Sequence, residues 1–287
     1  MALGGAGTHT SAVGDGLRPP RTRTPWLLLA PGLAWLTIFF VVPLIELGRG
    51  SLVDGGLSNY SNVFSDNGEV ILRTFAYAFA ATVLAIVLGY PLAYFIAMKA
   101  GRWKTLLLAS VVVPFFVTYL IRTLAWKILL YGEGPVAGFL RWTGLLSKNG
   151  EILNTHAAVV GALLYNFLPF MVLPIYVSLD KIDRRLLEAA PDLYADGRRT
   201  FFKVTLPLSL PGVFAGSLLT FIPSCGDFVN AELLGGDRQR MIGNIIERNF
   251  LRENFRPEMS ALSFVLMLLI LGGVLLYARV LGTDELV

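Results

Sequence analysis

The sequence predicts an all-α membrane protein with six transmembrane helices and a polar segment between the fourth and fifth helices. Only 15% of its 287 residues are charged and 55% are hydrophobic, whereas a soluble domain carries about 25% charged residues. The apolar residues also form runs of about 20 or more, the length that crosses a hydrocarbon core of roughly 30 Å. A β-barrel would need short alternating segments of about ten residues, and the sequence has none.

The charge balance and the cysteine and histidine content exclude several other classes. The formal net charge is +4, but the basic residues lie at the ends of apolar runs, where they set membrane orientation, so they do not indicate nucleic-acid binding. Cys225 is the one cysteine, which excludes an intrachain disulfide. His9 and His156 lie far apart and have no cysteine partners, so we expect no metal site.

The first predicted helix, residues 26–47, follows a flexible tail over 1–25 that is rich in Gly, Ala, Thr and Pro. This run is longer than the apolar part of a secretory signal and lacks a convincing cleavage site, so we expect a retained helix. Residues 48–69 are polar and rich in turn formers, which predicts a loop. The second helix covers 70–98. A tight basic turn follows, formed by Lys99, Arg102 and Lys104.

The remaining membrane helices alternate with polar stretches. Helices three to six are predicted at 105–130, 155–179, 206–229 and 257–281. The segment 180–205 separates helices four and five. A second polar stretch, 230–256, is long enough for an amphipathic helix at about 241–250. A short tail, 282–287, ends the chain.

Lysine and arginine in short loops predict the orientation, because cytoplasmic loops carry an excess of both. The 180–205 segment is strongly basic, with Lys181, Arg184, Arg185, Arg198, Arg199 and Lys203. The loops 48–69 and 131–154 on the opposite side hold few basic residues, namely Arg49, Arg141 and Lys148. The arginines of 230–256 are balanced by acids. We therefore expect both termini and the 180–205 segment to be cytoplasmic.

The ionisable residues of the helices gather near the predicted outer face rather than at the membrane midplane. Arg122, for example, lies about 26 Å along its helix from residue 105, at 1.5 Å per residue. An ion-coupled carrier usually has an ionisable group at midplane depth, so this distribution counts against one. A substrate path, snorkelling and interhelical ion pairs all stay open as roles. The candidate path residues are Glu46, Tyr119, Arg122, Asn166, Asp227 and Glu232.

The stretch 188–211 is an amphipathic, basic interruption between two apolar segments. Glu188 with Ala189 and Ala190 predicts a helix start, because an acid in the first turn suits the helix dipole. Gly197 permits a turn, and Thr200 is placed to cap a second short helix. The sequence therefore predicts a helix, a turn and a helix along the membrane surface, either as a docking surface for a partner or as a simple anchor.

The same stretch resembles the EAA motif of permease subunits of importing ABC transporters. The matching positions are Glu188, Ala189, Ala190, Val204, Leu206 and Pro207. The family's glycine falls at Tyr194, and Gly197 lies three residues later. The resemblance implies that 180–205 is a cytoplasmic coupling helix, which sits in a groove of an ATPase subunit.

The resemblance extends to residues 114–130 (PFFVTYLIRTLAWKILL) and 226–236 (GDFVNAELLGG), which look like the spermidine/putrescine-type permeases. It implies a permease over 26–281 in a bacterial inner membrane, pairing with a second related permease, two ATPase subunits and an extracytoplasmic binding protein. A polyamine is the expected solute, and opines, phosphonates and iron complexes are alternatives. A cationic solute favours outer acids, for which Glu46, Asp227 and Glu232 are candidates.

Two rival classes fit the sequence less well. An autonomous secondary transporter needs a midplane ionisable group or internal repeats, and a membrane enzyme needs a polar catalytic cluster; the sequence shows neither. It also has no GxxxxGK[ST] phosphate loop. We therefore expect no cofactor and no ATP hydrolysis in this chain, with ATP and Mg²⁺ bound by the partner ATPase.

Overall fold

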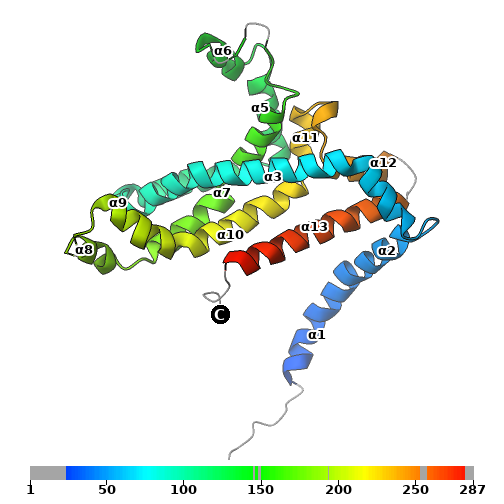
Figure 1. Cartoon of the computed structure of the whole chain (residues 1–287), viewed down its shortest axis with the longest axis horizontal. Helices are drawn as coiled ribbons and strands as arrows, with labels where there is room; N and C mark the ends of the chain where they lie inside the picture. The colour runs from blue at the N-terminus through cyan, green and yellow to red at the C-terminus, as the bar shows by residue number, and fades with distance from the viewer. Residues whose placement is uncertain (1–23, 145, 148–149, 193, 253–256, 282–287) are drawn as a thin grey trace, which may run out of the picture. The chain divides into compact units, whose positions relative to one another are not determined.

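A computed structural model describes residues 24–144, 146–147, 150–192, 194–252 and 257–281, and every regular element in these ranges is helical (Figure 1). Most of the predicted N-terminal tail and all of the C-terminal tail lie outside the described residues. The chain divides into two units, Met1–Leu47 and Gly48–Val287, and each is described by itself.

The N-terminal unit holds α1 (Thr24–Leu36), a π-helical turn (Thr37–Val41) and the start of α2 (Val42–Ser51). The stretch Leu28–Ser51 is long and apolar enough to cross a bilayer. Pro43 follows the π turn by two residues. A proline lacks an N–H and its ring clashes with the carbonyl four residues earlier, so the wider turn relieves that conflict.

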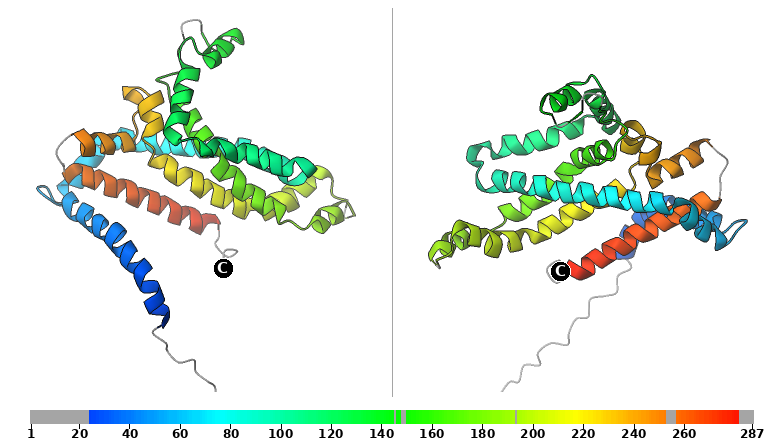
Figure 2. Two further views of the ribbon diagram at one scale, coloured as in Figure 1. Left: turned by 180° about the vertical axis from the view of Figure 1, so that it is seen from behind. Right: turned by 45° about the horizontal axis from the view of Figure 1, so that its top comes forward.

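The second unit is built on four long helices, α3 (Ser58–Met98), α7 (His156–Asp180), α10 (Leu206–Cys225) and α13 (Pro257–Leu281). Helix α3 packs along α7, α10 and α13, and α10 also packs along α7 (Figures 1 and 2). Small residues on α3 lie opposite larger ones on α7, as Ala85 and Ala93 do in a buried cluster with Met171 and Ile175. Such small-to-large packing is how membrane helices approach closely.

Helices α7 and α10 approach each other closely at two glycines, Gly212 and Gly216, which are four residues apart on α10. A Cβ added at Gly212 would lie 2.6 Å from the Pro174 carbonyl oxygen. One added at Gly216 would lie 2.9 Å from the Met171 sulfur and 3.0 Å from its carbonyl oxygen. This is the small-xxx-small arrangement of membrane helix pairs, in which only hydrogen fits between the backbones.

Several predicted helix boundaries differ from the structure. Helix α3 begins at Ser58, so most of the loop predicted at 48–69 is helical. The turn before it is closed by the Asn59 side chain, which donates to the carbonyls of Ser51 and Val53, both at 3.0 Å. Helix α10 ends at Cys225 rather than 229.

The predicted third helix, 105–130, is broken. It consists of α4 (Lys104–Val112), a 3₁₀ turn (Val113–Phe116) and α5 (Tyr119–Leu130), with a bend of 95°. Pro114 lies in the 3₁₀ turn, and Val117 then takes an extended backbone with ψ of 133°. Among the described residues, five helices are therefore long and apolar enough to span a membrane, or six if the bent pair counts as one span.

Shorter helices connect these spans. They are η2 (Gly101–Trp103), α6 (Pro135–Trp142), α8 (Arg184–Asp192), α9 (Gly197–Thr200), η4 (Phe201–Thr205), α11 (Val229–Leu234), η5 (Asp237–Gln239) and α12 (Ile242–Arg252). Within the second unit, α8 and α9 lie where α3 and α7 end, and α11 and α12 lie toward the other end of the bundle (Figure 1). The predicted amphipathic helix near 241–250 corresponds to α12.

The close approach at Gly212 predicts a specific stability loss. We expect Gly212→Ala to lower the free energy of unfolding by about 1–3 kcal/mol, because overpacking forces the two backbones apart. The matched control is Gly161→Ala on α7, where nothing lies within 4 Å of the added Cβ. Thermal unfolding of the purified protein in detergent should show a lower melting temperature for Gly212→Ala alone. Equal melting temperatures for both variants would contradict this packing.

Candidate functional site

Helix α8 starts one turn before Glu188. The Asp183 carboxylate accepts a hydrogen bond from the Arg185 N–H at 2.9 Å, which caps the first turn of a helix. The helix therefore begins at Arg184, and the expectation that Glu188 lies in the first turn is wrong.

The three residues of the EAA match lie on different sides of α8. Ala190 is buried, whereas Glu188 and Ala189 are exposed. Leu187 packs against the cluster that holds Ile182. Helix α8 thus rests on the bundle through Leu187, buries Ala190 and leaves Glu188 and Ala189 exposed.

Tyr194, at the position where the family pattern has glycine, closes α8. Its N–H donates to the Pro191 carbonyl at 2.9 Å, and the Ala195 N–H donates to the Ala190 carbonyl at 3.0 Å. These two bonds form a Schellman motif, whose C′ residue is left-handed and usually glycine. Tyr194 has φ of +57°, a conformation that costs a non-glycine residue roughly 1–2 kcal/mol. The turn therefore lies at Tyr194, not at Gly197 as the sequence predicts.

The second helix of the segment begins at Gly197. The Asp196 carboxylate accepts from the Arg199 N–H at 2.7 Å and caps it, so the predicted Thr200 cap is wrong. The helix continues through a π turn, Phe201–Thr205, which precedes Pro207 as another precedes Pro43. Gly197–Cys225 is thus one continuous helix. Of the remaining coupling candidates, Val204 and Leu206 are partly buried and Pro207 is exposed.

Aromatic contacts fix this second helix to α3. The Phe201 ring meets the Tyr90 and Tyr94 rings edge-on, with centroids 5.8 and 5.7 Å apart. The Tyr90 hydroxyl is hydrogen bonded to the Ser209 hydroxyl at 2.8 Å. The 180–205 segment is therefore joined to α3 and α10 through packed side chains.

A second candidate site lies at the other end of α10, around Asp227. Its carboxylate accepts a hydrogen bond from the Tyr119 hydroxyl and another from the Asn230 N–H at 2.9 Å. The Asn230 side-chain amide donates to the Tyr119 oxygen at 2.6 Å. Tyr119 begins α5 directly after the break in the third predicted helix. The structure thus brings Tyr119 and Asp227 together, although they come from separate spans.

Two further polar side chains, Asn166 on α7 and Thr123 on α5, complete this group. The oxygen of the Asn230 amide accepts from Asn166 at 3.0 Å and from Thr123 at 3.1 Å. Asn166 is buried, and its own amide oxygen has no hydrogen-bond partner in the described part of the chain. Sequence reasoning identifies Asn166 but misses Thr123 and Asn230, although Asn230 is three residues after Asp227. We call Tyr119, Thr123, Asn166, Asp227 and Asn230 the Asp227 cluster.

Arg122 is buried beside this cluster but does not neutralise Asp227 by an ion pair in the described residues. Its guanidinium lies 4.5 Å from the Phe115 ring centroid and 5.7 Å from that of Tyr119. It donates to the Pro114 carbonyl at 3.3 Å. Stacking on aromatic faces stabilises a buried cation, so Arg122 is held at the helix break.

The two other predicted path acids lie elsewhere. The Arg248 guanidinium donates to both Glu232 oxygens, at 2.9 and 3.0 Å, which joins α11 to α12. This hydrogen bond raises the pKa of Arg248, so its guanidinium stays charged. Glu46 is an exposed residue of α2 in the N-terminal unit. Two acids that sequence reasoning did not single out, Glu133 and Glu151, line a cavity of about 310 Å³ together with Tyr131 and Asn154.

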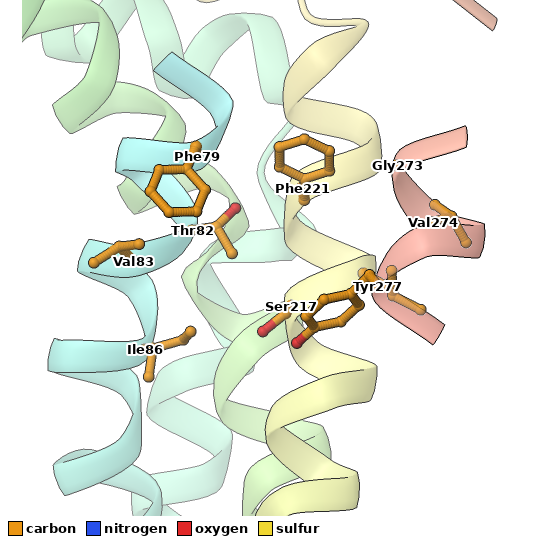
Figure 3. Close-up of a pocket in the computed structure, with 10 residues that line it drawn as sticks. Phe79, Thr82, Val83, Ile86, Ser217, Phe221, Gly273, Val274 and Tyr277 are labelled. Carbon is orange, nitrogen blue, oxygen red and sulfur yellow. The ribbon is translucent and has the colours of Figure 1, made fainter. Parts of the chain in front are cut away.

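A cavity of about 220 Å³ lies between α3, α10 and α13. Figure 3 shows Phe79 and Thr82 of α3, Ser217 and Phe221 of α10, and Tyr277 of α13 around it. Its lining is mostly apolar and, among the described residues, contains no Asp, Glu, His, Lys or Arg. Such a lining gives a charged solute only hydroxyl and ring contacts.

Comparison with known proteins identifies relatives over most of the chain. Residues 85–281 match the family described as binding-protein-dependent transport system inner membrane component. The spermidine/putrescine transport system permease protein PotB of Haemophilus influenzae is 37% identical over 86% of this chain and 90% of its own length. PotB of Escherichia coli K12 is also 37% identical, over 86% of this chain and 94% of its own.

A solved structure shares the fold. It is a chain of a bacterial alginate ABC transporter in complex with an alginate pentasaccharide-bound periplasmic protein. The superposition has a TM-score of 0.73 and covers 92% of this chain and 94% of the other, with 18% sequence identity.

Proposed function

Because this chain belongs to the family of binding-protein-dependent transport system inner membrane components, we propose that it is the permease subunit of an ATP-driven ABC importer for a polyamine such as spermidine or putrescine. The observation that carries the solute class is the 37% identity to PotB, which extends over 86% of the chain. Opines, phosphonates and iron complexes are the alternative solutes.

The energy for transport comes from a separate ATPase, since this sequence has no phosphate loop. The outward face of α8, with Glu188 and Ala189, is the proposed docking surface. The six basic residues of the 180–205 segment support a cytoplasmic position for it, where ATP is available. A bound ATPase would carry ATP and Mg²⁺, and this chain would hold neither.

The packed contacts of the segment support a coupling mechanism. Movement of the ATPase would displace α8 and the continuous helix Gly197–Cys225. Phe201 would carry this displacement to Tyr90 and Tyr94 on α3. Since packed interfaces change between discrete arrangements, closure of the ATPases would switch the bundle between inward-facing and outward-facing states.

The Asp227 cluster is the proposed solute-sensing part of the path. A buried carboxylate at a broken membrane helix is a typical feature of a solute or ion site. Asp227 would attract an ammonium group, and the free oxygen of Asn166 would accept one of its hydrogens. Glu133 and Glu151 add negative charge at their own cavity, while Glu46 and Glu232 stay predictions as path residues.

The remaining subunits are proposed from the family. An extracytoplasmic binding protein would deliver the solute, and a second, related permease would complete the path. Many large apolar side chains are exposed on this chain, such as Phe79, Leu88 and Leu276, and lipid or a second permease would cover them.

A charge reversal at Glu188 tests the docking surface. We expect Glu188→Lys to abolish co-purification of the ATPase and to reduce ATP-dependent uptake at least about 10-fold, as truncated interface anchors do. The control is Asp66→Lys, an exposed acid near the other end of α3. The docking surface is wrong if Glu188→Lys retains both the ATPase and full uptake.

A charge removal at Asp227 tests the solute path. We expect Asp227→Asn to keep one acceptor oxygen, for the Asn230 N–H, to lose the acceptor of the Tyr119 hydroxyl, and to reduce spermidine uptake about 10-fold or more, because a charge-assisted contact is lost. ATPase co-purification should not change. Asp237→Asn, at an exposed acid paired with Arg240, is the control.

Uptake assays with the cognate binding protein should compare polyamines with opines, phosphonates and iron complexes, and preference for one of these alternatives would overturn the polyamine assignment.

A further inference from the structure

Tyr194 combines two features that no contact within the described chain explains. Its backbone is left-handed, with φ of +57°, and the residue is 94% exposed. The other described non-glycine residues with positive φ are Asp54 and Asn154, residue types that adopt this conformation more readily. Tyr194 therefore holds a strained position without gaining packing from the described part of its own chain.

The hydrogen bonds of the turn would form equally well with glycine. Both bonds of the Schellman motif use backbone atoms, from Tyr194 and Ala195 to Pro191 and Ala190. Capping of α8 thus needs the left-handed backbone but not the phenol ring. What the tyrosine adds is a large, exposed aromatic side chain two residues after the last residue of α8, the helix that also carries the exposed Glu188 and Ala189.

We propose that the Tyr194 side chain is an anchor for the ATPase subunit, which it contacts in a pocket on that subunit's surface, and that it helps to determine which ATPase this permease accepts. This inference rests on the proposed function. Tyrosine is enriched among residues that dominate binding energy, because its ring buries a large area and its hydroxyl keeps a polar partner. Strained backbone persists mainly where it serves function.

A membrane surface fits Tyr194 less well than a protein partner does. Tyrosine rings do occur in the interfacial layer of bilayers. Here, however, the exposed carboxylates of Asp192 and Asp196 flank the ring two residues away on either side. Placing the ring among lipid head groups would bring both carboxylates to an anionic surface, which is unfavourable, while the exposed Arg198 and Arg199 that follow would be attracted to it, so the experiment below includes a lipid outcome.

Three substitutions separate the anchor from the helix cap. The permease pair is purified in nanodiscs and titrated with the ATPase subunit. Tyr194→Gly should raise the melting temperature by about 2 °C, because the strain is relieved, and should weaken ATPase binding about 10-fold or more. Tyr194→Phe should bind within about threefold of the original protein, since it keeps the ring. Tyr194→Ala should weaken binding without the gain in stability.

The proposal is overturned if Tyr194→Gly binds the ATPase as tightly as the original chain, since the residue would then only cap the helix. If Glu188→Lys abolishes binding in the same assay, the docking surface survives and only the anchor fails. If the original chain binds no ATPase, both proposals fail.

A fluorophore at position 194 shows whether the ATPase or the membrane surrounds this residue. It is environment-sensitive and is attached through Tyr194→Cys in a chain whose buried Cys225 is replaced by serine. A blue shift on addition of the ATPase supports the anchor. A shift that is already present in lipid and that the ATPase does not change assigns the residue to the membrane instead.

Discussion

The close approach of α10 to α7 at Gly212 and Gly216 is the constraint on which the arrangement of both candidate sites depends. The helix Gly197–Cys225 has 29 residues and, at 1.5 Å per residue, is roughly 44 Å long. The 180–205 segment lies at its start, and Asp227 follows its end by two residues. If this helix moves as a body against its neighbour, a displacement at one site would reach the other.

Much of the fold follows from the sequence because membrane helices need long apolar runs. The cores of α3, α7, α10 and α13 agree with those runs. The helix boundaries do not, because a mainly polar stretch also forms helix when its few apolar residues pack against a neighbour. In α3, Val63 and Ile71 are buried against Ile242 and Leu262. The break before Tyr119 was not predicted, because Pro114 and the extended residues after it lie within an uninterrupted apolar run.

The candidate sites were predictable to different degrees. The EAA match identified the coupling candidates, yet only the backbone geometry shows that Ala190 lies inward, that Asp196 is the cap and that Tyr194 occupies the left-handed position. The Asp227 cluster joins residues separated by 40 to more than 100 positions. No local pattern reports these long-range contacts, so sequence reasoning misses Thr123 and gives Tyr119, Asn166 and Asp227 only as separate path residues. Asn230 is different, because its bond to Asp227 spans three residues and a local capping pattern could have indicated it.

The central claim is that the outward face of α8 contacts an ATPase subunit, and cysteine cross-linking tests it most directly. Ala189→Cys and Ala157→Cys replace exposed alanines on α8 and at the start of α7, toward opposite ends of the bundle, in a chain whose buried Cys225 is replaced by serine. After treatment of the assembled transporter with a short thiol-reactive cross-linker, we expect a product with the ATPase from Ala189→Cys and none from Ala157→Cys. A cross-link from position 157 with none from position 189 would contradict the account.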